Sequence, residues 1–169
     1  MPSLILFRHG KSDWNAGEAD DLVRPLSGRG RRSARTMGRF LADAGQLPDH
    51  VLSSPAERAL ETIRIAMKAG RWSCPVGIRN ALYGGVAELL DELRGLPPEA
   101  RVALIVGHEP TWSETLELLI GGGRVRMPTG ALARVELDVA RWEDLGPARG
   151  ELAWLVHPRL LGTGGRHTT

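Results

Sequence analysis

Short apolar runs alternate with stretches of helical periodicity over the first two thirds of the chain. Runs that end in a loop predict buried strands at residues 3–7, 50–53, 75–78 and 102–106. Apolar positions repeating every three or four residues predict helices over 27–45, from 54 onward with Pro55 in the first turn, over 86–93 and over 111–120. The unbroken run VALIV at 102–106 is typical of a parallel strand covered on both faces.

The pattern changes after the glycine triplet at 121–123. Residues 131–137 and 152–156 predict two strands with no strong helix between them, so we expect edge strands there, one of them antiparallel. The earlier alternation predicts an α/β fold, a three-layer α/β/α sandwich with a mostly parallel central sheet. We expect a single domain over 1–161 and a flexible tail over 162–169, which is rich in glycine and threonine.

Composition restricts the class of protein without choosing a function. The chain has 169 residues, 42% hydrophobic and 25% charged, which is typical of one globular domain. The single cysteine, Cys74, excludes an internal disulfide and a cysteine-based zinc site. We find no signal-peptide pattern and no apolar run long enough for a membrane helix, so we expect a cytoplasmic protein that binds no membrane. The net charge is only +2 and the basic residues are dispersed, which argues against nucleic-acid binding.

Two histidines each follow a predicted buried strand. His9 comes after residues 3–7, and His108 comes after residues 102–106. Ligands of parallel sheets bind beyond the carboxyl ends of the strands, so the two rings meet there if these strands are neighbours. Arg8 places a cation beside His9, which lowers the pKa of an imidazole and keeps it neutral and nucleophilic. Gly10 permits close backbone approach.

An arginine and an amide add hydrogen-bond donors to this edge. Arg58 falls in the first turn of the helix that follows residues 50–53, where a cation is unfavourable unless an anion is bound nearby. Asn15 is a neutral donor in the loop after His9. A phosphoryl transition state spreads charge over three oxygens, which such donors stabilise. His9 would take the phosphoryl group covalently before water releases it.

These motifs resemble the histidine phosphatase superfamily, which includes the RHG phosphatases and the phosphoglycerate mutases. The opening block is LFRHGKSDWN at 6–15, and later blocks follow in order: RPLS at 24–27 with Gly30, SSP at 53–55 with Arg58, and VGHEP at 106–110. The compact length and MPTGALA at 127–133 are similar to the SixA-type phosphohistidine phosphatase branch. The resemblance covers residues 4–158.

The resemblance implies a phosphoglycerate mutase-like fold and a role for each matched residue. His9 would be the nucleophile that becomes phosphorylated. Arg8, Arg58 and His108 would form the phosphate pocket with it, and Asn15 would be a further phosphate contact. Neither a metal nor an organic cofactor is implied.

The chain departs from the family pattern at two acidic positions. Glu109 stands where asparagine is common, and we expect it to point outward, away from phosphate. Residues 80–85 offer no match to the glutamate general acid of larger members. The nearest carboxylates are Glu88 and Asp13, for which a solvated surface charge is the simpler interpretation. Imidazole leaves more easily than an alkoxide, so a site without a dedicated acid suits phosphohistidine.

We therefore expect a phosphatase acting through a phosphohistidine intermediate, with phosphohistidine of a partner protein as its substrate. A small phosphorylated metabolite is the first alternative. A non-catalytic module that binds a phosphorylated ligand is the second, which the presence of a nucleophile disfavours.

Overall fold

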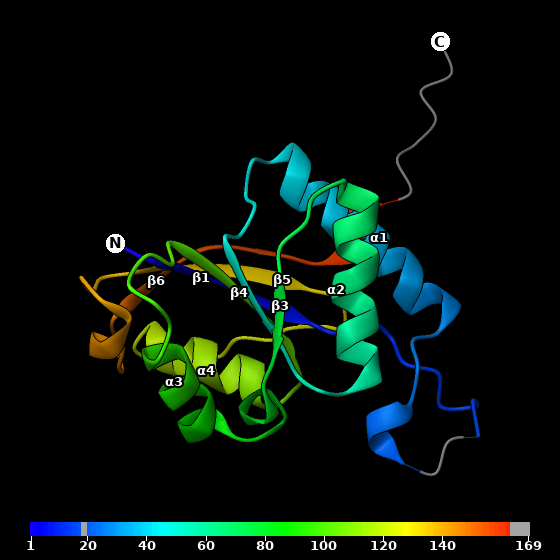
Figure 1. The fold of residues 1–169 in the computed structure, drawn as a ribbon, viewed down its shortest axis with the longest axis horizontal. Helices are drawn as coiled ribbons and strands as arrows, with labels where there is room; N and C mark the ends of the chain where they lie inside the picture. Colours follow the sequence, from blue (N-terminus) through cyan, green and yellow to red (C-terminus); the bar gives the residue numbers. More distant parts are fainter. Residues whose placement is uncertain (18–19, 163–169) are drawn as a thin grey trace.

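The computed structural model describes residues 1–17 and 20–162, which form a six-stranded sheet in the order β3-β2-β4-β1-β5-β6 (Figure 1). Its strands are β1 (Ser3–Arg8), β2 (His50–Ser53), β3 (Val76–Ile78), β4 (Val102–Gly107), β5 (Leu132–Leu137) and β6 (Gly150–Val156). The first four are parallel. The mixed α/β architecture confirms the predicted fold class. Of the tail predicted over 162–169, residues 163–169 lie outside the described residues.

Helices cover both faces of the sheet. They are α1 (Gly28–Asp43), α2 (Glu57–Gly70), α3 (Val86–Arg94) and α4 (Thr111–Leu119), with short 3-10 helices η1 (Asp21–Val23), η2 (Asn80–Tyr83), η3 (Trp142–Asp144) and η4 (Pro158–Leu161). Helices α1 and α2 pack on one face, and α3 and α4 on the other (Figure 1). Alternate residues of β1 face opposite cores, because Leu6 packs with α3 and α4 whereas Phe7 packs with α1 and α2.

Local sequence accounts for the ends of α1. The Ser27 side chain caps its start by accepting a hydrogen bond from the Gly30 N–H, at the residue where the sequence predicts the helix to begin. Gly45 follows the last helical turn with φ +66°, which glycine adopts without strain. The start of α2 differs from the prediction, because Ala56 is its N-cap and Pro55 precedes the helix.

The last two strands differ from the prediction of two edge strands, one of them antiparallel. Both are antiparallel to their neighbours, and only β6 is an edge strand. β5 hydrogen-bonds to β1 and β6, and most of its side chains are buried. The prediction failed here because the pattern of apolar residues indicates which side chains are buried but does not indicate the direction of a strand. In the described ranges, no helix combines the length and apolarity that crossing a bilayer requires.

Candidate active site

The two predicted histidines meet at the carboxyl edge of the sheet. β1 and β4 are parallel neighbours, and Arg8 pairs with Gly107 in their register. His9 and His108 are the next residues of each chain segment, so both emerge at the same place. Their ring centroids lie 5.1 Å apart. This confirms the prediction that the two strands are adjacent and bring the rings together.

Hydrogen bonds fix both the position and the tautomer of His9. Its backbone N–H donates to the Gly107 carbonyl at 3.0 Å, and its carbonyl accepts from the Gly130 N–H at 2.9 Å. The ring Nδ1 lies 2.6 Å from the Gly10 carbonyl oxygen. Since a carbonyl can only accept, Nδ1 carries the proton and Nε2 keeps its lone pair.

Burial keeps the His9 ring neutral. The side chain is buried, and the pKa of His9 falls to about 3, mainly because of desolvation. The neighbouring His108 ring and the guanidinium groups of Arg58 and Arg8 lower the pKa of His9 further, by less than burial does and in that order. The expected direction of the shift is therefore present, but burial rather than the adjacent Arg8 is its principal cause.

A pair of glycines lets the loop after His9 pack against the first turn of α1. A Cβ at Gly10 would lie 2.7 Å from the Gly30 carbonyl oxygen, and a Cβ at Gly30 would lie 2.1 Å from that of Lys11. Neither contact is sterically possible, so both positions require glycine. The Gly10 N–H also donates to the Thr62 hydroxyl of α2 at 3.1 Å, which joins this loop to the second helix.

Arg58 meets an internal anion at the start of α2. Its side chain is buried, with 5% exposed. Nη1 donates to the Asp21 carbonyl at 2.7 Å, and Nη2 donates to the Asp21 carboxylate at 2.9 Å. A cation at a helix N-terminus is unfavourable without a neighbouring anion, and here a carboxylate supplies that charge.

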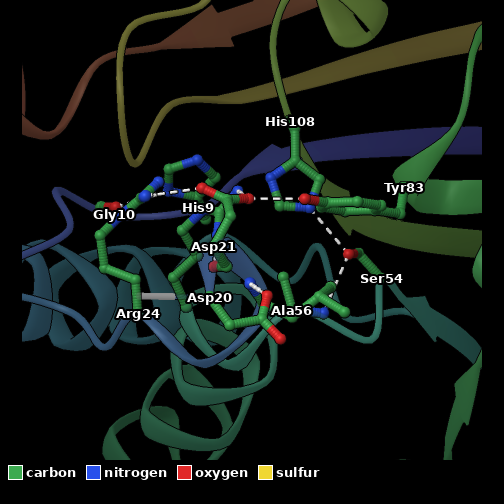
Figure 2. A network of polar contacts seen from close by, with 11 residues as sticks. His9, Gly10, Asp20, Asp21, Arg24, Ser54, Ala56, Tyr83 and His108 are labelled. Atoms are coloured by element: carbon green, nitrogen blue, oxygen red, sulfur yellow. Dashed lines mark hydrogen bonds and ion pairs between the residues drawn. The ribbon is translucent and has the colours of Figure 1, made fainter. Parts of the chain in front are cut away.

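Asp21 is a member of the cluster that sequence reasoning missed. Its carboxylate accepts hydrogen bonds from the Tyr83 hydroxyl at 2.6 Å and from Arg24 at 2.6 Å, in addition to Arg58 (Figure 2). These donors, Tyr83 foremost, hold the pKa of Asp21 well below its usual range. The one feature of the sequence that could have pointed to Asp21 is its spacing of three residues from Arg24. That spacing is a weak signal, because the surrounding segment has no periodicity.

His108 is fixed by a serine and a tyrosine. Its Nε2 hydrogen-bonds to the Ser54 hydroxyl at 2.7 Å, and the Tyr83 ring meets it edge-on, with centroids 5.3 Å apart (Figure 2). The pKa of His108 falls to about 4, mainly through burial and then through the charge of Arg58. The ring is therefore neutral near pH 7.

Arg8 lies on another side of the cluster. It is half-buried, and its Nη1 donates to the Met127 carbonyl at 2.9 Å. Three side-chain nitrogens of the predicted site residues are buried without a hydrogen-bond partner in the described part of the chain. They are Nε of Arg8, Nε of Arg58 and Nδ1 of His108. Unpaired buried groups are costly, so an oxyanion accepting from them would be stabilised.

The remaining candidates lie apart from these residues. Asn15 is exposed, and its backbone N–H donates to the Asp13 carboxylate at 2.9 Å. Glu88 is exposed in the first turn of α3. Glu109 is half-buried. Its carboxylate accepts hydrogen bonds from the Ser113 N–H and hydroxyl, because the first turn of α4 needs an acceptor.

Within residues 1–17 and 20–162, no group of three or more histidine, cysteine, aspartate or glutamate side chains is arranged to hold a metal ion. The described part of the cluster instead offers two neutral imidazoles, two guanidinium groups and one ionised carboxylate. This set is suited to nucleophilic attack on an anionic group held by guanidinium donors.

Comparison with known proteins places the chain in a family. Residues 4–84 match the model of the histidine phosphatase superfamily, branch 1. An uncharacterised protein of Mycobacterium leprae is 31% identical over 90% of this chain and 99% of its own length. The presumed phosphohistidine phosphatase SixA of Nakamurella multipartitia is 30% identical, with a TM-score of 0.79 over 93% of this chain and 96% of that one.

A second solved structure, the protein histidine phosphatase SixA complexed with tungstate, is 27% identical. Its TM-score is 0.81 over 94% of this chain and 99% of its own. The chain therefore belongs to the histidine phosphatase superfamily. Within that superfamily it belongs to the SixA-type branch, which confirms the resemblance drawn from its motifs.

Proposed function

We propose that this protein is a phosphatase that removes the phosphoryl group from phosphohistidine through a covalent intermediate on His9. The observation that carries the proposal is the state of the His9 ring. It is buried and neutral, and its Nδ1 proton is committed to the Gly10 carbonyl. Nε2 is therefore an unprotonated nucleophile at neutral pH, beside a second histidine and two arginines.

The reaction has two displacements at phosphorus. In the first, the Nε2 lone pair of His9 forms a bond to phosphorus while the substrate N–P bond breaks. The electrons of that bond return to the leaving ring, which departs as neutral imidazole because its other nitrogen carries a proton. In the second, water attacks phosphorus, the bond to His9 breaks, and inorganic phosphate leaves. Arg8, Arg58 and His108 hold the phosphoryl oxygens.

The carboxylate of the cluster favours a leaving group that needs little protonation. Asp21 bonds to Arg58, and its lowered pKa keeps it ionised at neutral pH, so it is a poor proton donor. Imidazole, with an ordinary pKa near 6.5, leaves without the strong acid that an alkoxide requires. The similarity to the protein histidine phosphatase SixA, solved with tungstate, supports the same substrate class.

A small phosphorylated metabolite is the second candidate substrate. The observation in its favour is that 82 residues, 45% of this chain, are 44% identical to a 2,3-bisphosphoglycerate-dependent phosphoglycerate mutase of Thermobifida fusca. The match covers only 32% of that mutase. A module that binds phosphate without turnover is disfavoured, because simple binding needs no unprotonated nucleophile.

Steady-state kinetics on three substrates tests the proposal: a peptide carrying one phosphohistidine, an aryl phosphate and a sugar phosphate. We expect kcat/KM to be about 10²-fold or more higher for the peptide than for the sugar phosphate, which is the usual contribution of the missing general acid. The aryl phosphate, with its better leaving group, falls between them. A preference for the sugar phosphate would overturn the substrate assignment while leaving the mechanism.

A further inference from the structure

A pocket of about 640 Å³ adjoins the catalytic cluster, because Arg8 belongs to both. Its walls come from the first turns of α1, the segment 126–129 and the residues that follow β6. We call it the basic pocket, because its lining includes the cations Arg8, Lys11, Arg29, Arg32, Arg126 and Arg159. Among the described residues, its lining contains no carboxylate.

The cations of the basic pocket form no close ion pairs in the described part of the chain, although the charge of Glu109 acts on Arg8 from a greater distance. None of the six takes part in the ion pairs found among residues 1–17 and 20–162. Their combined charge also acts on His157, which lines the same pocket. The pKa of His157 is lowered, first by burial and then by the charges of Arg159, Arg29 and Arg126.

Two residues that line the basic pocket, Ser33 and Pro158, are closely packed around Gly130. The exposed cationic side chains of the lining form what we call its rim. Gly130 has φ +76°, and a Cβ there would lie 3.0 Å from Pro158 and 3.2 Å from Ser33, so α1 and η4 close tightly around this turn. The side chains at the rim, such as Arg29 and Arg159, are exposed. Leu160, next to Arg159, is 78% exposed, which adds an apolar contact point beside the charges.

We propose that the basic pocket binds acidic residues that flank the phosphohistidine of a partner protein. This proposal rests on the proposed function and extends it to a substrate class. Arg8 belongs to both sites, so a chain whose phosphoryl group reaches His9 passes beside the basic pocket. Exposed arginines next to an apolar side chain are typical of protein interfaces, and unpaired surface charge accelerates association with a complementary partner.

The exposure of the rim favours a protein over a small polyanion. A compact site for a highly charged small molecule needs donors held in place by burial, as Arg58 is in the catalytic cluster. Here five of the six cations are exposed, namely Lys11, Arg29, Arg32, Arg126 and Arg159. Such side chains can adjust to an irregular acidic surface, at modest energy for each contact.

Two phosphohistidine peptides of equal length test the proposal, one with glutamates and one with lysines flanking the phosphorylated residue. We expect the wild-type protein to show about tenfold higher kcat/KM for the glutamate peptide at low salt, with the preference shrinking as ionic strength rises. The double variant Arg29→Glu/Arg159→Glu should lose the preference and keep its turnover of an aryl phosphate. Glutamate at position 29 lies in the first turn of α1, where a negative charge is tolerated.

Arg35→Glu is the matched control, because Arg35 is an exposed residue of the same helix and does not line the basic pocket. It should retain the preference. Equal rates on both peptides in the wild-type protein would overturn the docking proposal and leave the proposed function standing. Hydrolysis of aryl phosphate with no hydrolysis of either peptide would instead overturn the substrate assignment. A third outcome is that the wild-type protein shows no peptide preference but hydrolyses inorganic tripolyphosphate in a salt-sensitive way, and that the double variant loses this activity. That outcome would overturn the partner protein as the occupant of the basic pocket and favour a small polyanion.

Discussion

The catalytic cluster and the basic pocket share Arg8 but treat positive charge in opposite ways. In the cluster, Arg58 is buried, and both of its terminal nitrogens already bond to Asp21. In the basic pocket, residues such as Arg29 and Arg126 are exposed and lack ion-pair partners among the described residues. Buried, oriented charge stabilises a transition state, whereas exposed charge guides encounter. The contrast predicts large effects on chemistry from the first region and modest effects on recognition from the second.

Removing the nucleophile should give the largest effect. We expect His9→Ala to abolish turnover of phosphohistidine and aryl phosphate, because it removes the nitrogen that forms the covalent intermediate. The measurement is steady-state phosphate release. His50→Ala is the control, since His50 starts β2 at the opposite end of the strand and pairs with Asp49. Substantial activity in His9→Ala would rule out the covalent mechanism.

Loss of the buried guanidinium should rank second. Arg58→Ala should lower kcat by at least ~100-fold on every substrate, which is the usual effect of removing one oriented donor to transition-state charge. Arg64→Ala changes an exposed arginine of the same helix and should have little effect. If the two variants behaved alike, Arg58 would be no more than a surface charge.

Acid should destabilise the cluster through its neutral histidine. The pKa of His9 is about 3 in the folded state and near 6.5 when unfolded, so the unfolded state binds more protons between these values. Stability is then full above pH 6.5 and is lost as the pH falls toward 3. From pH 7 to pH 5, His9 should account for about 1–2 kcal/mol of lost unfolding free energy.

Urea unfolding at the two pH values measures this loss, and His9→Gln should be less sensitive to acid than the wild-type protein. Among the described residues that line the basic pocket, the histidine is His157, which is half-exposed although its pKa is also lowered. His157→Gln is therefore the matched variant and should leave the acid sensitivity nearly intact. An identical loss of stability in wild type and His9→Gln would contradict the buried, neutral state of the ring.

Releasing the internal anion should give the smallest change. Asp21→Asn keeps the shape of the side chain but removes the charge that competes with phosphate for Arg58. We expect inorganic phosphate to bind about two- to fivefold more tightly, the range for a partly exposed ion pair. Isothermal titration calorimetry measures the change. Weaker phosphate binding in the variant would show that Asp21 orients Arg58 rather than competing for it.

Much of the fold could be predicted from sequence because burial and periodicity are local signals. The run at 102–106 identified β4, and the position of Ser27 identified the start of α1. The meeting of His9 and His108 could also be predicted, because parallel strands that are neighbours end at the same edge.

What could not be predicted depends on contacts between distant segments. The apolar pattern of β5 is the same whether the strand pairs parallel or antiparallel, so its antiparallel pairing with β1 could not be predicted from it. Asp21 begins the short helix η1 in a segment whose sequence has no periodicity, and its role follows from Arg58 and Tyr83, which are 37 and 62 residues away in sequence. The charges of the basic pocket are scattered through the chain and gather only after α1, the segment 126–129 and η4 pack together.

A rapid-quench experiment under single-turnover conditions tests the central claim most directly. The protein is mixed with a peptide carrying ³²P-labelled phosphohistidine, stopped in alkali, and mapped by digestion and mass spectrometry, with ³¹P resonances distinguishing the ring nitrogens. The account predicts transient label on Nε2 of His9, which rises and then decays into inorganic phosphate. Label that passes to phosphate without residing on the protein, or that resides on a residue other than His9, would contradict it.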